Sequence, residues 1–290
     1  MQFLVELLSS GLAAGAVYGL IAMSFAIIYK STGLLNFAQG EMGMIVAYVA
    51  WSISVHSNGN PFVVAVGAIL FAILFALVVE RVAIRPMMGE PILSQIMVTI
   101  ALSVIFRSLV ILVWDGLPHN MGVTIGNELV DLGGVRVRWA QIALVALLFA
   151  AVVGFWGYFR YSRFGVAMRA VASDDRTAQL MGVNAARVQM VAWAAATVLA
   201  GIAGVLFAIA YELSPSLYSL GLKAFPATIL GGLDAVLGSA FGGIAIGIIE
   251  NLAGAYVSSA LKEVAGFAII ILVLMVRPYG LFGEKRIERL

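Results

Sequence analysis

Cysteine is absent from the 290 residues, and charged side chains make up only 11% of them. The missing thiols exclude a disulfide framework and a thiolate metal site. A water-soluble domain of this length needs more charge to cover its surface, so a soluble globular protein is also excluded. In place of charge the chain has apolar residues, at 62%, and a mean hydropathy of +1.05.

Catalytic and nucleotide-binding motifs are missing as well. The two histidines, His56 and His119, are far apart and form no HExxH zinc motif. The sequence contains no GxSxG nucleophile elbow and no GxxxxGK[ST] phosphate loop. No basic cluster interleaved with aromatic residues indicates nucleic acid. We therefore expect no enzyme activity, metal site, cofactor or nucleic-acid partner, and any use of ATP belongs to another chain.

Long apolar runs predict an all-α, polytopic integral membrane bundle. A helix needs about 20 residues to cross the hydrocarbon core, and these runs are continuous, whereas a membrane β-barrel alternates. The first run lacks a basic leader, so we interpret it as a membrane helix and not as a signal peptide. We expect one domain over residues 1–290 with about eight to nine membrane segments, some interrupted: 4–29, 34–55, 62–80, 92–114, 139–159, 188–211, 223–233, 235–255 and 263–276.

Basic residues predict the orientation, because Lys and Arg concentrate in cytoplasmic loops. With segment 160–187 and the C-terminal tail inside, twelve basic residues are cytoplasmic: Lys30, Arg81, Arg85, Arg160, Arg163, Arg169, Arg176, Arg187, Arg277, Lys285, Arg286 and Arg289. Four are outside: Arg136, Arg138, Lys223 and Lys262. This arrangement requires segment 223–255 to cross twice or to turn back, since 223–233 is too short for a full span.

The inner segment RAVASDDRTAQLMGVNAAR, residues 169–187, is a polar island between apolar runs. It predicts a short helix over about 174–181, with Ser173 as its N-cap, Asp174 and Asp175 in the first turn and Gly182 at its C-terminal end. A helix of this length is not stable alone in water. The residues leave two interpretations open: a loop that joins two spans, or a helix that docks on a cytoplasmic partner.

Two polar, glycine-containing stretches interrupt the apolar pattern: TGLLNFAQGEMG, residues 32–43, and ILGGLDAVLGSAFGG, residues 229–243. Membrane carriers often bind solutes where helices are interrupted, because freed backbone groups and helix ends can meet polar solutes. Plain cytoplasmic turns are the alternative interpretation. The candidate residues of a solute path are Asn36, Gln39, Glu41, Gly231, Gly232 and Asp234.

Small and charged residues inside the apolar runs give two further expectations. GxxxG spacing lets helices approach closely in lipid, and we expect internal packing in preference to a dimer seam. This spacing occurs at Gly11, Gly15 and Gly19, and again at Gly238/Gly242 and Gly243/Gly247. Charged side chains are costly in the membrane, so the deepest of them, Arg107, is expected to face protein or a cavity. The other ionisable residues in the runs are Glu6, Glu41 and Glu250, with Asp234 at a break.

Several segments together resemble one family, the permease subunits of ABC importers for branched-chain amino acids (LivH-like), and the resemblance covers essentially the whole chain. They are GLAAGAVYGLIAMSFAIIYKSTGLLNFAQGEMGMIVAY, ERVAIRPMMGEPILSQIMVTIAL, RFGVAMRAVASDDRTAQLMGVNAARVQMVAWAAATVLAGIAGVL, FPATILGGLDAVLGSAFGGIAIGIIE and VRPYGLFG. The resemblance implies a bacterial inner-membrane importer with a second related permease, two cytoplasmic ATPase subunits and a periplasmic binding protein. It also implies that 160–187 is the coupling loop, with the ATPase contacts Arg169, Ser173, Asp174, Asp175, Arg176, Gln179 and Gly182.

One departure from the family pattern concerns Gln39, where many relatives carry His. Glutamine keeps hydrogen bonding but does not titrate near neutral pH, so a proton-linked role at this position is doubtful. The same family also serves urea and short amides, so the solute does not follow from the resemblance. A gradient-driven secondary transporter is a different alternative, suggested by the interrupted segments and by Arg107 and Glu41. A membrane enzyme is a weaker one, because the catalytic motifs are missing.

Overall fold

The structure is a computed structural model that describes residues 2–123, 128–131 and 136–283. The described residues are mostly helical and include one small antiparallel hairpin of β1 (Leu129–Asp131) and β2 (Arg136–Arg138), which confirms the all-α prediction in outline. A π-helical turn η1 (Glu80–Ile84) and the 3-10 turns η2 (Arg85–Met87) and η3 (Pro215–Tyr218) lie between helices. The helices are α1 Gln2–Thr32, α2 Gln39–His56, α3 Pro61–Val79, α4 Ile92–Trp114, α5 Trp139–Tyr161, α6 Arg163–Ser173, α7 Asp175–Leu180, α8 Ala185–Ala210, α9 Ser219–Gly231, α10 Val236–Tyr256 and α11 Ser259–Val276.

Seven helices in the described residues are long and apolar enough to cross a membrane, namely α1, α3, α4, α5, α8, α10 and α11. The predicted count of eight to nine segments is not confirmed. Segments 34–55 and 223–233 became α2 and α9, which are not among the seven. The 13 residues of α9 reach about 20 Å at 1.5 Å per residue, less than the ~30 Å of a hydrocarbon core. The start of α2 is delayed to Gln39 by the polar linker before it.

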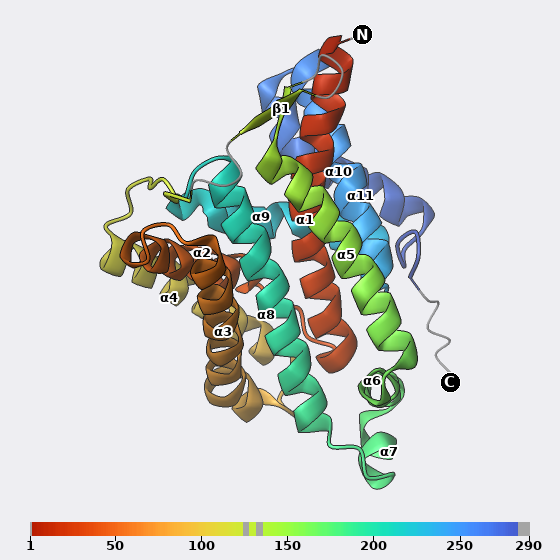
Figure 1. Ribbon diagram of the computed structural model, residues 1–290. Helices are drawn as coiled ribbons and strands as arrows, with labels where there is room; N and C mark the ends of the chain where they lie inside the picture. Colours follow the sequence, from red (N-terminus) through yellow and green to blue (C-terminus); the bar gives the residue numbers. More distant parts are fainter. Residues whose placement is uncertain (1, 124–127, 132–135, 284–290) are drawn as a thin grey trace.

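The long helices divide into an inner and an outer group. In the most apolar 18-residue window of α1, 89% of the residues are buried, against 11% for α5 and 17% for α11. Figure 1 shows α1 in the middle, with α5, α8 and α10 beside it. The outer helices α3, α4, α5 and α11 turn large apolar side chains outward, which is the expected surface of a protein solvated by lipid tails.

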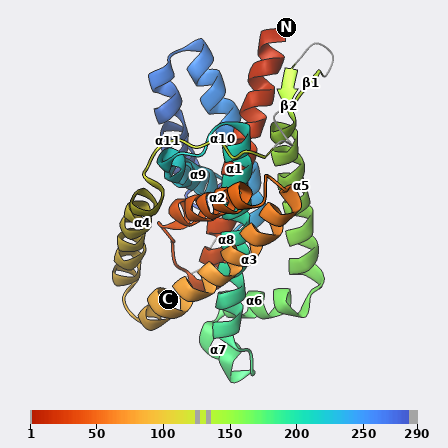
Figure 2. The same cartoon turned by 60° about the vertical axis from the view of Figure 1, so that its left-hand side comes forward.

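Helix α2 runs across the middle of the bundle, at a steep angle to α1 and α8 (Figure 2). All of its residues from Gln39 to Tyr48 are buried, polar side chains included. A helix that is covered on every side has no polar stripe to mark it. Its sequence therefore reads like that of a membrane span, although the helix is held inside the protein.

The glycine pairs bring α1 and α10 into direct backbone contact, as the internal-packing prediction expects. A Cβ atom at Gly15 would lie 2.7 Å from Ile244 Cα, and one at Gly11 would lie 3.0 Å from Ile248 Cα. At Gly19 it would lie 2.9 Å from the carbonyl oxygen of Ala240. Packing this close gives van der Waals contact and removes backbone from lipid, which is what drives helix association in membranes.

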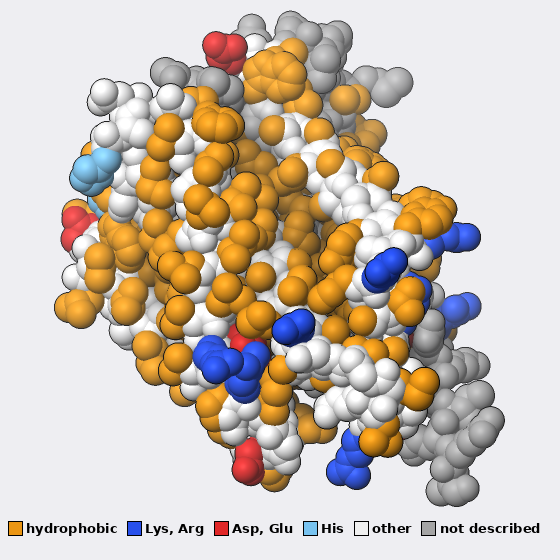
Figure 3. Space-filling view, turned by 60° about the horizontal axis from the view of Figure 1, so that its bottom comes forward, with side chains coloured by type: hydrophobic (Ala, Val, Ile, Leu, Met, Phe, Trp, Pro, Cys, Tyr) orange, Lys and Arg blue, Asp and Glu red, His pale blue; other side chains and the backbone are white. Residues whose placement is uncertain are grey.

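The ends of the helices follow the predicted distribution of charge. The end of α1 with Lys30, the turn after α3 with Arg81 and Arg85, and helices α6 and α7 lie at one end of the molecule (Figure 1). Lys and Arg side chains gather on this end in the space-filling view (Figure 3). At the opposite end the Arg138 guanidinium donates to the carbonyl of Ala210, which joins the end of β2 to the end of α8. Lys285, Arg286 and Arg289 lie outside the described residues.

A substitution at the α1–α10 contact tests this packing. Gly15→Val is expected to destabilise the protein by about 1–3 kcal/mol or more, because its side chain would overlap the backbone of α10. Thermal unfolding of the detergent-solubilised protein measures the change. Gly154→Ala in α5 is the control: a Cβ at Gly154 meets nothing within 4 Å, so this variant should be neutral or slightly more stable. Equal behaviour of the two variants would contradict the packing.

Candidate functional site: a polar junction and a coupling segment

The linker before α2 satisfies its polar groups within the protein. Asn36 Nδ2 donates to Gln39 Oε1 at 2.8 Å, and Asn36 Oδ1 accepts from the backbone N–H of Ala38 at 3.1 Å. Gln39 Nε2 then donates to the carbonyl oxygen of Ala196 in α8 at 3.1 Å. Asn36 and Gln39 are 1% and 0% exposed. The two amides therefore tie the break in the chain to α8, because an unpaired backbone group is costly inside a membrane protein.

Helix α4 holds the same linker from the other side. The N–H of Phe37 donates to Thr99 Oγ1 at 3.3 Å, and the Thr99 hydroxyl lies 3.4 Å from the carbonyl oxygen of Leu35. Thr99 is fully buried. Sequence reasoning missed this residue, since a single threonine in an apolar run carries no signal of its own.

A charged pair begins two residues after Gln39, at Glu41. Glu41 Oε1 accepts from Arg107 Nη2 at 2.8 Å, and the Arg107 guanidinium lies over the Tyr218 ring, 3.5 Å from its centroid. The Glu41 side chain is 5% exposed, whereas that of Arg107 is 37% exposed. The positive charge of Arg107 in α4 is thus compensated by Glu41 of α2 and by the aromatic face of Tyr218 in η3. As expected for a deep arginine, Arg107 faces protein, although more than a third of its side chain is uncovered.

The first turns of α2 and α9 meet beside the Glu41–Arg107 pair. A Cβ atom at Gly40 would lie 2.9 Å from Gly221 Cα, so α2 and α9 touch backbone to backbone. We call the group Asn36, Gln39, Glu41, Arg107 and Tyr218 the polar junction. It joins α2, α4, α8 and the start of α9, with the amides and Glu41 buried and Arg107 at the edge of the bundle.

The second predicted break is a separate structure. Gly231 and Gly232 end α9, and Gly232 has a φ of +110°, a conformation that favours glycine. The N–H groups of Leu281 and Phe282 donate to Leu230 and Gly231 at 2.9 and 3.1 Å, so the C-terminal segment covers this turn. Lys30 Nζ donates to the carbonyl oxygen of Asp234 at 3.0 Å. These bonds join the turn to the C-terminal segment and to the end of α1.

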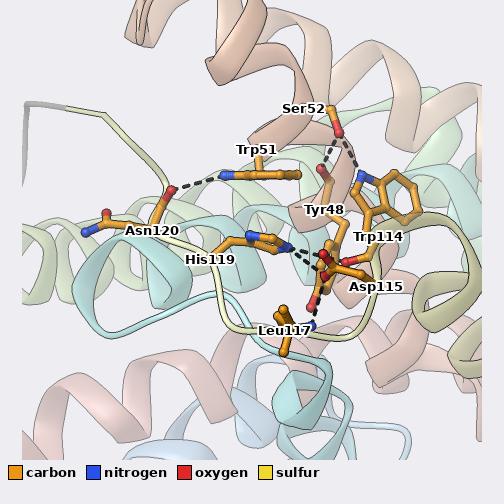
Figure 4. Close-up of polar contacts among 8 residues, drawn as sticks. All are labelled: Tyr48, Trp51, Ser52, Trp114, Asp115, Leu117, His119 and Asn120. Carbon is orange, nitrogen blue, oxygen red and sulfur yellow. Dashed lines mark hydrogen bonds and ion pairs between the residues drawn. The ribbon is translucent and has the colours of Figure 1, made fainter.

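An aromatic cluster fixes the far end of α2 (Figure 4). The His119 ring stacks on Trp51 with centroids 4.1 Å apart, and its Nε2 lies 3.3 Å from Asp115 Oδ1. Trp114 Nε1 donates to Ser52 Oγ at 2.8 Å. The backbone of His119 also pairs with that of Leu213. Helix α2 is therefore anchored at both ends, by the polar junction and by this cluster.

The polar island contains two helices where one was predicted. Helix α6 (Arg163–Ser173) precedes α7, and Ser173 is its last residue, so the predicted N-cap role of Ser173 is wrong. Asp174 is the cap: its Oδ1 accepts from the Thr177 N–H at 3.0 Å and its Oδ2 from the Thr177 hydroxyl at 2.7 Å. Asp174 suits the cap because its two carboxylate oxygens accept from two donors, the backbone N–H and the hydroxyl of Thr177. The same backbone and hydroxyl bonds hold the pKa of Asp174 below its usual range.

The C-terminal end of α7 follows the prediction. Gly182 has a φ of +86°, and the N–H groups of Gly182 and Val183 donate to the carbonyls of Gln179 and Ala178 at 3.0 Å each. This is a Schellman motif. It leaves Leu180 and Met181 88% and 81% exposed at the tip. The C-terminal end of α7 and the residue after it therefore present two large apolar side chains, although the helix is only 6 residues long.

The remaining predicted coupling residues differ in their surroundings. The Arg169 guanidinium donates to the carbonyl of Phe159 and lies over its ring at 5.0 Å, which holds α6 against the end of α5. Arg176 and Gln179 are exposed on α7, and Asp175 is its first residue. Arg169 thus holds α6 in place, whereas the exposed Arg176 and Gln179 lie on α7.

Residues 7–275 match the model of the family described as branched-chain amino acid transport system / permease component. The chain belongs to this family. It is 33% identical over 306 residues to the high-affinity branched-chain amino acid transport system permease protein LivH of Escherichia coli K12, covering 99% of both proteins. It is 29% identical to BraD, a permease protein of the same description from Pseudomonas aeruginosa, covering 98% of this chain and 97% of that one.

A solved structure shares the fold. PsaBC from Streptococcus pneumoniae, determined in complex with a Fab, matches with a TM-score of 0.50 at 13% identity and covers 91% of this chain and 89% of that one. At this identity the likeness concerns the fold alone. The family and the seven apolar helices make the permease a multi-pass protein of the bacterial inner membrane, and its relatives are transport permeases, which are not themselves enzymes.

The charged pair of the polar junction gives a prediction for the folded permease. Glu41→Gln and Arg107→Met should each destabilise it, because each leaves the partner charge uncompensated. The double variant should then be more stable than the sum of the two effects predicts, with a coupling energy of about 1–3 kcal/mol. Unfolding of the three variants in detergent measures this. Additivity within about 0.5 kcal/mol would show that the pair does not interact.

Proposed function

We propose that this chain is the permease subunit of an ATP-driven importer that moves branched-chain or closely related small apolar amino acids inward. The observation that carries the proposal is the end-to-end likeness to LivH of Escherichia coli, which its name assigns to branched-chain amino acid transport. The permease, a single domain over residues 1–290, has no phosphate-binding loop, so ATP hydrolysis takes place on partner chains. A urea or short-amide importer is a less favoured alternative, because the relatives are named for amino acids.

The surface around Arg107 supports a second permease as a partner. Arg107 lies in the C-terminal half of α4, and its side chain is 37% exposed among exposed apolar residues that include Val104, Leu109 and Ile111. An arginine at the centre of a membrane helix costs about 2.5–3.5 kcal/mol on insertion scales, and one nearer the helix end still loses hydrogen-bond partners where it faces lipid. A related permease that covers this face, with a water-filled path between the two subunits, removes this cost. The polar junction then borders the solute path, and a periplasmic binding protein delivers the solute to its outer end.

The inner segment 160–187 supports coupling to two cytoplasmic ATPase subunits. Helix α7 is too short to be stable without a partner, and its exposed Leu180 and Met181 suit an apolar groove. In the proposed cycle, ATP binding draws the ATPase subunits together and moves α7. The motion passes into α8, which starts at Ala185, and reaches the carbonyl of Ala196, to which Gln39 is bound. About 17 Å of rigid helix thus separates the start of α8 from the polar junction.

The charges of the polar junction suit a zwitterionic solute. A free amino acid carries a carboxylate that arginine binds well and an ammonium group that a carboxylate binds well. Arg107 and Glu41 offer both partners within one ion pair, so the passing solute can exchange with it. Asn36 and Gln39 add neutral hydrogen-bonding groups beside the pair. Uncharged urea would use none of these charges, which also favours amino acids. We assign Gly231, Gly232 and Asp234 to the hinge at the end of α9.

Substitution of the amides tests the solute path. Asn36→Ala and Gln39→Ala should each lower ATP-dependent leucine uptake several-fold, since they release the linker from α8. Assembly with the partner subunits should be unchanged. Uptake into proteoliposomes and co-purification of the subunits measure the two effects, with Ser9→Ala at the exposed start of α1 as a control. Normal uptake by both variants would remove these residues from the path.

Two substitutions at one position test the coupling segment. Asp174→Ala removes both the cap and the charge of α7, whereas Asp174→Asn keeps a capping side chain without the charge. If coupling requires the folded helix, stimulation of ATPase activity by the loaded binding protein should fall several-fold in the alanine variant and persist in the asparagine variant. Equal stimulation in wild type and both variants would rule out coupling through α7. The pKa of Asp174 lies below its usual range, so lowering the pH past that pKa should protonate the carboxyl and weaken the cap in wild type. The Asp174→Asn variant has no carboxyl to protonate and should not respond.

A further inference from the structure

A polar cavity of about 730 Å³ lies beside the coupling segment, at the inner end of the bundle. Its wall is formed by the end of α1 and the following linker, by the turns between α3 and α4, by α7 and by the start of α8. The side chains that matter below are Leu34, Ile84, Met88, Gln95, Gln179 and Gln189. The proposed solute path does not use this cavity, since the polar junction lies deeper, at the starts of α2 and α9.

Neutral hydrogen-bonding groups dominate the polar part of the cavity. Four carboxamides line it, from Gln95, Gln179, Asn184 and Gln189, and none of the described lining residues is charged. Gln189 is 8% exposed, and its carbonyl oxygen Oε1 is buried without a hydrogen-bond partner. A buried acceptor left unpaired is costly, so this atom is a position where a ligand donor is favoured.

The start of α8 provides donors on the same wall. Asn184 caps the helix by accepting from the Arg187 N–H at 3.0 Å, whereas the N–H groups of Ala185 and Ala186 have no acceptor in the described residues. Both alanines line the cavity. A helix of 26 residues has its positive dipole end here, which favours an anionic group. Gln189 lies one turn further along the same helix, so a donor site and an acceptor site are about 5–6 Å apart.

An apolar wall completes the arrangement, formed by Leu34, Ile84 and Met88. The cavity thus offers backbone donors for a carboxylate, an unpaired carbonyl for an ammonium group, and an apolar surface for a side chain. We propose that it binds a free apolar α-amino acid from the cytoplasm, as an effector site distinct from the solute path. Its carboxylate would lie at the start of α8 and its ammonium group against Gln189.

Binding here has a consequence for coupling, which rests on the proposed role of α7. The cavity is shared between the moving segment, through Gln179 and Gly182, and the body of the bundle, through Thr32 and Gln95. A ligand that contacts both sides stabilises one relative position of the two. Accumulated amino acid in the cytoplasm would therefore restrain α7 and slow its own import.

Calorimetric titration tests binding without requiring transport. The purified complex of permease and ATPase subunits, without nucleotide or binding protein, is titrated with leucine, leucinamide and 4-methylpentanoate. Leucine should bind, and the compounds that lack one charged end should bind at least about tenfold more weakly. Gln189→Leu should weaken leucine binding to a similar degree without destabilising the protein, because it removes a buried carbonyl oxygen that has no hydrogen-bond partner. Gln95→Leu is a second cavity variant, and Gln141→Leu at the outer end of α5 is the control.

Uptake into proteoliposomes tests the regulation. Millimolar leucine inside the vesicles should lower the initial rate of uptake several-fold in wild type and in Gln141→Leu, and should have little effect in Gln189→Leu. Absence of leucine binding, or binding that neither cavity variant weakens, would overturn the site. Binding without inhibition would overturn its regulatory role. A wild-type complex that shows no ATP-dependent uptake, while still binding leucine through Gln189, would instead refute the proposed function and leave the site standing.

Discussion

A break in a membrane-embedded chain must satisfy its own backbone and polar groups, and this constraint organises the permease. Lipid offers no hydrogen bonds, so the linker between α1 and α2 is closed by Asn36, Gln39 and Thr99. These bonds reach α8 and α4, which fixes α2 across the bundle. Once α2 is fixed, Glu41 is placed at Arg107, and Gly40 is placed at the start of α9.

The same bonds connect the polar junction to the helix that follows α7. Helix α8 carries Gln189 and its capped start at the inner end, and the carbonyl of Ala196 at the polar junction. A long helix transmits a displacement with little bending, whereas a loop would absorb it. The contact between α1 and α10, in contrast, holds the two helices in fixed positions. Their glycine backbones touch directly and leave no room for one helix to slide along the other. The bundle thus combines a fixed pair of helices with a helix whose inner end is attached to an accessible segment.

Much of this fold was predictable from the sequence, and the exceptions have physical reasons. Apolar runs marked the seven spanning helices, and the spacing of Gly15 and Gly19 predicted internal packing. The sequence did not show that α2 is internal, since a helix buried on all sides looks like a span. The cap of α7 was placed one residue early, because serine and aspartate both suit that role and only the structure shows which one ends α6.

The ion pair of the polar junction could not be predicted from the sequence. Glu41 and Arg107 were both conspicuous as charges in apolar runs, but 66 residues separate them and no local pattern pairs them. Their pairing depends on the crosswise placement of α2, which itself depends on neutral amides that carry little signal. The structure turns two isolated charges into one compensated pair with an uncovered edge on Arg107. The proposed second permease would cover that edge, which lipid tails leave without hydrogen-bond partners.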